Sequence, residues 1–240
     1  METLITIAVT FPVAVVTLLT GFGLGTVLTP VFTIFYDVKL AVLMVAIVHL
    51  LNNVFKLYLF RAHIDFGIIR RFGLLSIAGA FLGAVLQFYM HGGPLKVFLG
   101  VVLVILGGIE LVPTRKKLIL PKKVDFLGGF SSGVLGGLIG NQGAIRSAYL
   151  LNYQISKEAF IASATLIASI IDITRIPIYL TSHRQELAAE WAHIAWVVAT
   201  AYCGTLVGKR LLKRIDLGTF KKIVAAFVVL LRIGLAAGII

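Results

Sequence analysis

The chain of 240 residues contains little charge and almost no cysteine. Charged residues make up 13% and hydrophobic residues 59% of the sequence, and its mean hydropathy is +1.02, far above what a water-soluble domain requires. Because Cys203 is the single cysteine, an internal disulfide and a cysteine metal cluster are both excluded. The composition thus excludes a soluble globular protein, and we expect lipid to be its solvent.

Acidic residues are also scarce, since ten Asp and Glu stand against 22 Lys and Arg, for a formal net charge of +12. The cations fall mainly in short loops between apolar runs, where membrane topology explains them better than nucleic-acid binding. The sequence also lacks a His-Glu-x-x-His motif, a cysteine pair, a P-loop and a convincing nucleophile motif. We therefore predict no enzyme activity, no metal, no cofactor and no nucleic-acid partner.

Apolar runs long enough to cross the roughly 30 Å hydrocarbon core of a bilayer follow one another along the chain. The first lacks the basic start of a secretory signal and exceeds signal-peptide length, so we interpret it as a retained membrane element. The predicted segments lie near 4–36, 40–60, 67–90, 95–113, 124–153, 156–181, 190–211 and 218–240.

The chain divides into two similar halves, a first membrane repeat at 1–113 and a second at 124–240, joined by a basic linker at 114–123 that we expect to be cytoplasmic. Like residues recur between the halves in the same order, and such internal symmetry is expected of many transporter folds. The matched pairs, 118 to 125 residues apart, are Gly21/Gly140, Gly25/Gly143, Lys39/Lys157, Ala41/Ala159, Asn53/Asp172, Lys56/Arg175, Gly83/Gly208 and Lys96/Lys221.

Glycines gather in the middle of the first segment of each half, at 21–25 and at 136–143. Each glycine costs a helix interior about 1 kcal/mol relative to alanine, so the clusters predict a break in the helix. The alternative is a small-residue face for close helix packing. Asn141 and Gln142 suit such a face poorly, which favours the break.

Two four-segment halves, each opening with a glycine-rich broken segment, resemble the TauE/SafE sulfite exporter family over essentially the whole chain. The resemblance implies a multi-pass permease of a bacterial-type cytoplasmic membrane, the inner membrane of the cell, for sulfite, organosulfonates or related small anions. The stretches that carry it are Gly21-Phe22-Gly23-Leu24-Gly25-Thr26-Val27-Leu28-Thr29-Pro30, His49-Leu50-Leu51-Asn52-Asn53-Val54-Phe55-Lys56 and Gly140-Asn141-Gln142-Gly143-Ala144-Ile145-Arg146-Ser147.

The loop cations indicate whether the broken segments cross the membrane. If all eight segments cross, nine loop cations lie on each side, against the positive-inside rule. If the first and fifth enter as hairpins and return, fifteen lie on one side and only Lys39, Lys96 and Arg184 on the other. The competing explanation is that the loop after the seventh segment is an exception to the rule. We predict an all-α polytopic membrane protein with two inverted repeats, each a hairpin plus three transmembrane helices.

Four cations lie inside the spans, where charge is costly and marks functional sites: Lys56, Arg146, Arg175 and Arg232. Arg232 is the weakest candidate because it has no repeat equivalent and no nearby acid. The half-helices after each break would point free N–H groups and a positive dipole end at a small anion near the bilayer midplane. The predicted substrate-binding residues are Gly23, Gly25, Thr26, His49, Asn52, Asn53, Lys56, Asn141, Gln142, Gly143, Arg146 and Arg175.

Structural roles compete with these assignments. Asp172 and Arg175 could form an ion pair that only locks helices together, and His49 and Asn52 could make hydrogen bonds between helices. Asp172 is also the only acidic residue deep in a span, which makes it the candidate for proton coupling.

The predicted function is secondary transport of a small sulfur-containing anion by alternating access, and the alternative is a passive anion channel. Flux saturation, countertransport and proton dependence would separate the two. The expected partners are the anion and the bilayer, with a homodimer as an option because dimers are common among such small bundles.

Overall fold

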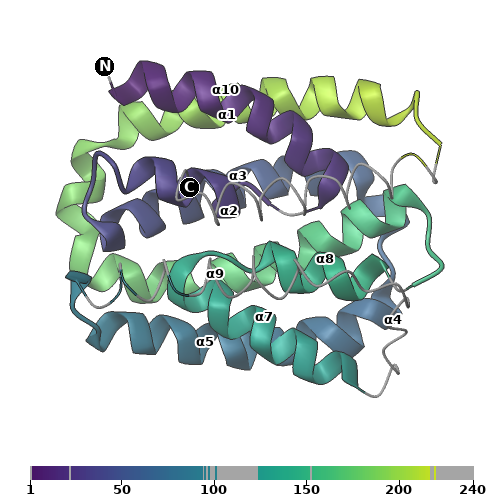
Figure 1. The fold of residues 1–240 in the computed structure, drawn as a ribbon, viewed down its shortest axis with the longest axis horizontal. Helices are drawn as coiled ribbons and strands as arrows, with labels where there is room; N and C mark the ends of the chain where they lie inside the picture. Colours follow the sequence, from purple (N-terminus) through teal and green to yellow (C-terminus); the bar gives the residue numbers. More distant parts are fainter. Residues whose placement is uncertain are drawn as a thin grey trace.

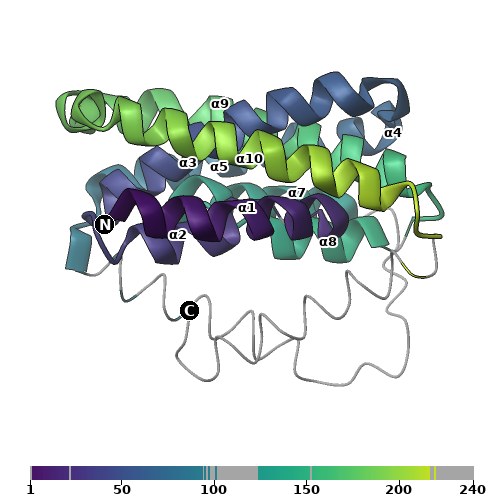
Figure 2. The same cartoon turned by 90° about the horizontal axis from the view of Figure 1, so that it is seen from above.

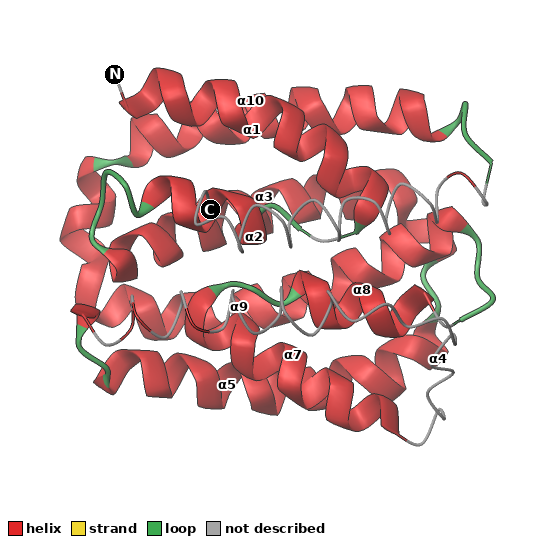
Figure 3. Cartoon of the chain, viewed as in Figure 1, coloured by secondary structure: helices red, strands yellow, loops and turns green. Residues whose placement is uncertain are grey.

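The computed structural model describes residues 2–93 except Phe22, residues 124–216 except Asn152, and residues 95, 97, 101 and 219. Within this described part every regular element is a helix, which confirms the all-α prediction (Figure 3). The predicted segments at 95–113 and 218–240 are almost wholly outside the described residues, as are the linker and Arg232. The proposed division at 114–123 therefore stays a prediction.

The first half contains α1 (Glu2–Thr20), α2 (Gly25–Phe32) and α3 (Val38–Phe60), then a short 3-10 turn, η1 (Arg61–His63). Its next span joins α4 (Phe66–Ile68), the π-helical η2 (Ile69–Gly73) and α5 (Leu74–Tyr89). The second half contains α7 (Asp125–Ile139), α8 (Gly143–Leu151), α9 (Lys157–Ala189) and α10 (Trp191–Leu212).

Five stretches are long and apolar enough to cross a bilayer: α1, α3 with η1, α4 through α5, α9 and α10. Their outer faces carry large apolar side chains, including Phe81 at 58% and Trp196 at 64% exposure, as a lipid environment requires. Helix α9 continues beyond the predicted end at residue 181, through a kink at His183, to Ala189. The prediction ended too early because hydropathy falls there while the helical backbone continues.

Both glycine-rich segments are broken at the predicted places. Gly21 and Gly23, with φ of +73° and +86°, separate α1 from α2, and Gly140, with φ of +78°, ends α7. Residues with a Cβ rarely adopt this left-handed conformation, whereas glycine does so at little cost. The half-helices α2 and α8 then begin at Gly25 and Gly143, as the sequence predicted.

Each broken segment turns back to the end of the molecule from which it started. At one end the Tyr36 hydroxyl lies 2.8 Å from Nδ1 of His193, whose Nε2 lies 2.7 Å from Oγ1 of Thr6, so the start of α1 and the end of α2 meet there. At the other end the Tyr153 hydroxyl donates to Oδ2 of Asp125, which joins the start of α7 to the end of α8. The two hairpins open at opposite ends of the molecule (Figures 1 and 2). The hairpin geometry is therefore present.

The inverted-repeat arrangement itself stays a prediction, because the last segment of each half is not described. In Figure 1, α1 runs away from the N-terminal end of the molecule and α7 runs towards it, as inversion requires.

The halves are interleaved, because the hairpin of each packs on a helix of the other. Helix α5 contacts α7 so closely that a Cβ added at Gly79 or Gly83 would overlap backbone atoms of α7. A Cβ added at Gly133 would overlap backbone atoms of α5 in the same way. Helix α10 packs on α1, where a Cβ at Gly204 would lie 2.6 Å from the carbonyl oxygen of Phe11. Small residues permit such close approach of membrane helices.

Candidate anion-binding site

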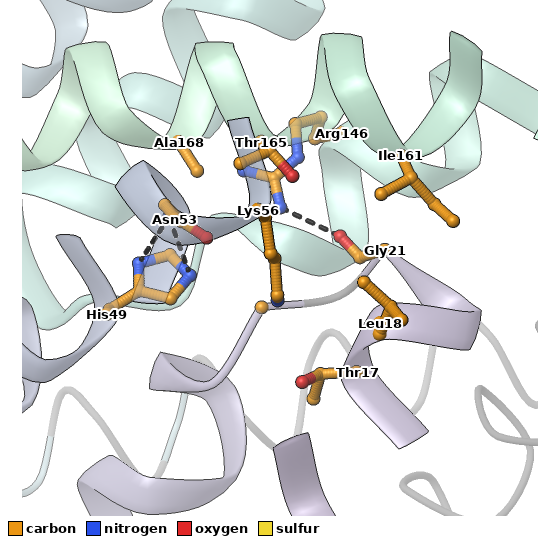
Figure 4. A pocket seen from close by; sticks show the side chains of 11 residues that line it. Thr17, Leu18, Gly21, His49, Asn53, Lys56, Arg146, Ile161, Thr165 and Ala168 are labelled. Carbon is orange, nitrogen blue, oxygen red and sulfur yellow. Dashed lines mark hydrogen bonds between the residues drawn. The ribbon is translucent and has the colours of Figure 1, made fainter. Parts of the chain in front are cut away.

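A small pocket lies beside the first break, where helices from both halves converge (Figure 4). Its cavity volume is about 10 Å³, room for about one water molecule. Five predicted site residues line it, contributed by the break, α3 and α8. The lining consists of Thr17, Leu18, Gly21, Gly23, His49, Asn53, Lys56, Arg146, Ile161, Thr165 and Ala168.

Arg146 lies in the first turn of α8 and is 1% exposed. Its Nη2 donates to the carbonyl oxygen of Gly21 at 2.8 Å (Figure 4), while Nε and Nη1 are buried and have no hydrogen-bond partner among the described residues. A buried donor without a partner costs free energy, and more so when it is charged. The unused N–H groups of Arg146 therefore require an acceptor.

Lys56 reaches the same pocket from α3 and is 3% exposed. Among the described residues it makes no hydrogen bond or ion pair, and the charge that acts on it is that of Arg146, which has the same sign. Two cations therefore share the pocket, and neither forms an ion pair with an acid among the described residues. Asp172, the acid whose charge acts on Arg146, is already bound to Arg175 and His49. Such an arrangement is costly in a low-dielectric interior.

Arg175 is neutralised, in contrast. Its Nε donates to Oδ1 of Asp172 at 2.9 Å, its Nη2 lies 2.8 Å from the same oxygen, and Nη1 donates to the carbonyl oxygen of Gly136. The predicted Asp172–Arg175 ion pair is therefore present, and its purely structural role stays a prediction. Arg175 is not among the residues that line this pocket, and its place in the predicted substrate-binding set stays a prediction.

His49 connects this ion pair to the pocket. Its Nδ1 lies 2.7 Å from Oδ2 of Asp172, and the side chain is buried. The other ring nitrogen faces the first break, because a Cβ on Gly23 would lie 2.6 Å from Nε2. Nδ2 of Asn53 lies 3.3 Å from the same nitrogen (Figure 4).

The two breaks touch each other beside the pocket. A Cβ on Gly25 would lie only 2.7 Å from the carbonyl oxygen of Gly140, and Oγ1 of Thr26 donates to Oδ1 of Asn141 at 3.2 Å. Thr26 and Asn141 therefore join the halves instead of lining the cavity.

Other predicted residues also lie outside the pocket lining. Asn52 accepts a hydrogen bond of 2.9 Å from Thr205 of α10, which is the bond between helices named as the alternative; its place in the predicted binding set stays a prediction. Gln142 is buried, and in the described part of the chain both polar atoms of its side chain lack a hydrogen-bond partner. Gly143 begins α8 without lining the cavity.

The site prediction missed Thr17, Leu18, Gly21, Ile161, Thr165 and Ala168 as lining residues. Gly21 could have been found, since it lies in the predicted break. Thr165 is one of the hydroxyl residues on the same predicted segment as Asp172 and Arg175, and the remaining four carry no sequence signal.

Two tyrosines outside the spans close the hairpin ends. Partial burial and a hydrogen bond to Glu190 raise the pKa of Tyr36, and burial and the bond to Asp125 raise the pKa of Tyr153 to about 12. Both phenols therefore remain protonated donors at neutral pH.

The family model for the sulfite exporter TauE/SafE matches residues 6–235. The chain belongs to this family. The TauE/SafE match covers both halves and every residue of the pocket, which confirms the resemblance found in the sequence. No curated protein matches the chain. Together with the five apolar spans, TauE/SafE membership identifies a multi-pass membrane protein of a transporter family.

Proposed function

We propose that this TauE/SafE protein is a secondary transporter that carries sulfite, an organosulfonate or a similar small sulfur-containing anion across the inner cell membrane. The observation that carries the proposal is the unneutralised pair Lys56 and Arg146, buried in one pocket beside a broken helix. Charges in such a place are stabilised by a counter-charge, and an anion supplies it.

The geometry favours an oxyanion. Nε and Nη1 of Arg146 have no hydrogen-bond partner among the described residues, and they lie on different edges of the planar guanidinium, so each can donate a separate hydrogen bond to a ligand oxygen. Lys56 adds a point charge on a flexible stem, which can move aside. Because the cavity is only about 10 Å³, an anion enters only when the lining side chains separate. This requirement favours a small ligand and a site that opens and closes.

Alternating access fits the interleaved packing. The pairs α1/α10 and α5/α7 each contain one helix from each half, held by close glycine contacts. We therefore propose that these pairs, and not the two sequence halves, move as bodies, with the pocket between them. Lys56 on α3 and Arg146 on α8 would then separate and approach during transport.

A thermal-shift screen of the purified protein tests the proposal with sulfite, sulfate, thiosulfate, sulfoacetate and simple carboxylates. At a hundred times its dissociation constant, a bound anion stabilises the folded state by about 2.7 kcal/mol. We expect sulfite or sulfoacetate to raise the melting temperature. A set of anions that all leave it unchanged contradicts the proposal.

A passive anion channel could use the same cations. The small cavity and the Arg146–Gly21 hydrogen bond that crosses its edge support the transporter. Liposomes preloaded with unlabelled sulfite discriminate between the two. The transporter exchanges internal for external anion and takes up labelled sulfite faster when preloaded, whereas a channel shows no such acceleration.

A further inference from the structure

We infer that His49 binds a proton that accompanies the anion, and that Asp172 holds the His49 ring in position for this. The inference rests on the proposed anion transport and adds its coupling ion. It starts from a juxtaposition: one nitrogen of the buried ring contacts an ion pair, and the other faces the first break beside the pocket cations.

The contact with Asp172 defines which nitrogen of the His49 ring carries no hydrogen when the ring is neutral. The Asp172 carboxylate, bound to Arg175, can only accept, so the Nδ1 atom of His49 carries a hydrogen and donates it. In the neutral ring Nε2 then has a lone pair. The amide nitrogen of Asn53 lies 3.3 Å from Nε2 and 3.4 Å from Nδ1, so it does not distinguish the two ring nitrogens, and the contact with Asp172 alone assigns the hydrogen to Nδ1. Gly23 has no side chain to cover Nε2.

The surrounding charges couple the proton to the anion. His49 faces Lys56 from its own helix, Arg146 from α8, and the Asp172–Arg175 pair from α9. A proton on Nε2 adds a third positive charge to a pocket that already holds two. A bound anion offsets this repulsion, so each ligand strengthens the binding of the other, and this coupling is reciprocal.

The proton balance is simple. The Nε2 lone pair takes one proton from water when the pocket is open to one side, and releases it to water on the other side. No other bond changes, so one proton moves with each anion. Asp172 is the competing carrier, but its protonation would weaken its contacts with both Arg175 and His49, at a cost in a buried site.

Calorimetry of the full-length protein tests this inference. Sulfite and, in parallel, sulfoacetate are titrated at mildly alkaline pH in two buffers that differ in ionisation enthalpy, which gives the protons taken up per bound anion. We expect uptake by the wild-type protein and its loss in His49→Gln. His193→Gln is the matched control, because His193 is also buried but lies outside the pocket; its uptake should equal that of the wild type.

The outcomes separate the inference from the function on which it rests. Anion binding with undiminished proton uptake in His49→Gln overturns the inference and leaves anion transport standing; the proton then belongs to Asp172 or to the ligand. Absence of anion binding by the wild-type protein overturns both. If His49→Gln does not fold, the double variant Asp172→Asn/Arg175→Gln keeps the ring but removes the carboxylate. Unchanged uptake there contradicts the positioning role of Asp172 and with it the inference.

Discussion

Arg146 donates a hydrogen bond to the carbonyl oxygen of Gly21, 125 residues away, at 2.8 Å. This contact joins the half-helix of the second half to the break of the first, and it places a guanidinium where a helix has just ended. The bond uses one nitrogen and leaves Nε and Nη1 available. The site is thus completed only when both halves are in place.

Removing either pocket cation should abolish anion binding without unfolding the protein. Lys56→Met and Arg146→Gln each delete a buried charge that forms no ion pair with a described residue, so the protein without ligand should be as stable as before or more so. The loss of a buried charge contact typically costs 2–5 kcal/mol of binding, so sulfite should no longer shift the melting temperature.

Lys39→Met is the control. Lys39 lies at the start of α3, whereas Lys56 lies near its end, and the Nζ of Lys39 donates to the carbonyl oxygen of Phe88 on α5. Wild-type affinity in the Lys56 or Arg146 variant would count against the proposed site.

A methyl group at the first break should block the pocket. In Gly23→Ala the new Cβ would lie 2.6 Å from Nε2 of His49, and φ of +86° disfavours any residue other than glycine. We expect a strain of about 1–3 kcal/mol and loss of uptake in liposomes. Gly93→Ala, where nothing lies within 4 Å of the added Cβ, should transport like the wild type.

The start of α8 offers an independent test of whether the free N–H groups at the start of a half-helix bind the anion. Gly143→Leu places a bulky side chain where the free N–H groups of the half-helix begin. We expect impaired uptake with normal membrane insertion. Unimpaired uptake would show that the anion does not approach this backbone.

Asp172→Asn should be destabilising because it leaves Arg175 buried beside a neutral partner. Breaking a buried pair on one side typically costs about 3–5 kcal/mol, measurable as a lower melting temperature. Adding Arg175→Gln should recover part of that loss. If Asp172 carries the coupled proton, the single variant also loses the pH dependence of transport; an unchanged pH profile rejects that role.

Membrane topology can be checked by labelling single cysteines in a Cys203→Ser background. Positions 116 and 213 should react from the same side, and positions 39 and 184 from the other, because both broken segments return. Labelling of 116 and 213 from opposite sides would reject the hairpin topology.

The sequence predicted those features whose energetic cost is local. A glycine cluster weakens a helix wherever it is placed, so the breaks at Gly21 and Gly140 could be predicted. A lysine in an apolar helix is costly in any fold, so Lys56 could be identified as a site residue.

Features that depend on the choice of a partner could not be predicted. Arg175 and Lys56 occupy matched positions, but Asp172 neutralises the first whereas Asn53 cannot neutralise the second. The bond from Thr205 to Asn52 depends equally on how α10 packs. Periodicity identifies the polar face of a helix, not the neighbour that it contacts.

The close contacts of α5 with α7 and of α1 with α10 have a consequence for biosynthesis. A half made alone would leave the glycine-lined surface of its third span open to lipid tails, which cannot fit it as closely as a helix does. During synthesis α1 and α5 must therefore stay in the membrane without these partners until α7 and α10 have been made. Two half-length polypeptides should accumulate stably only when both are synthesised in the same cell.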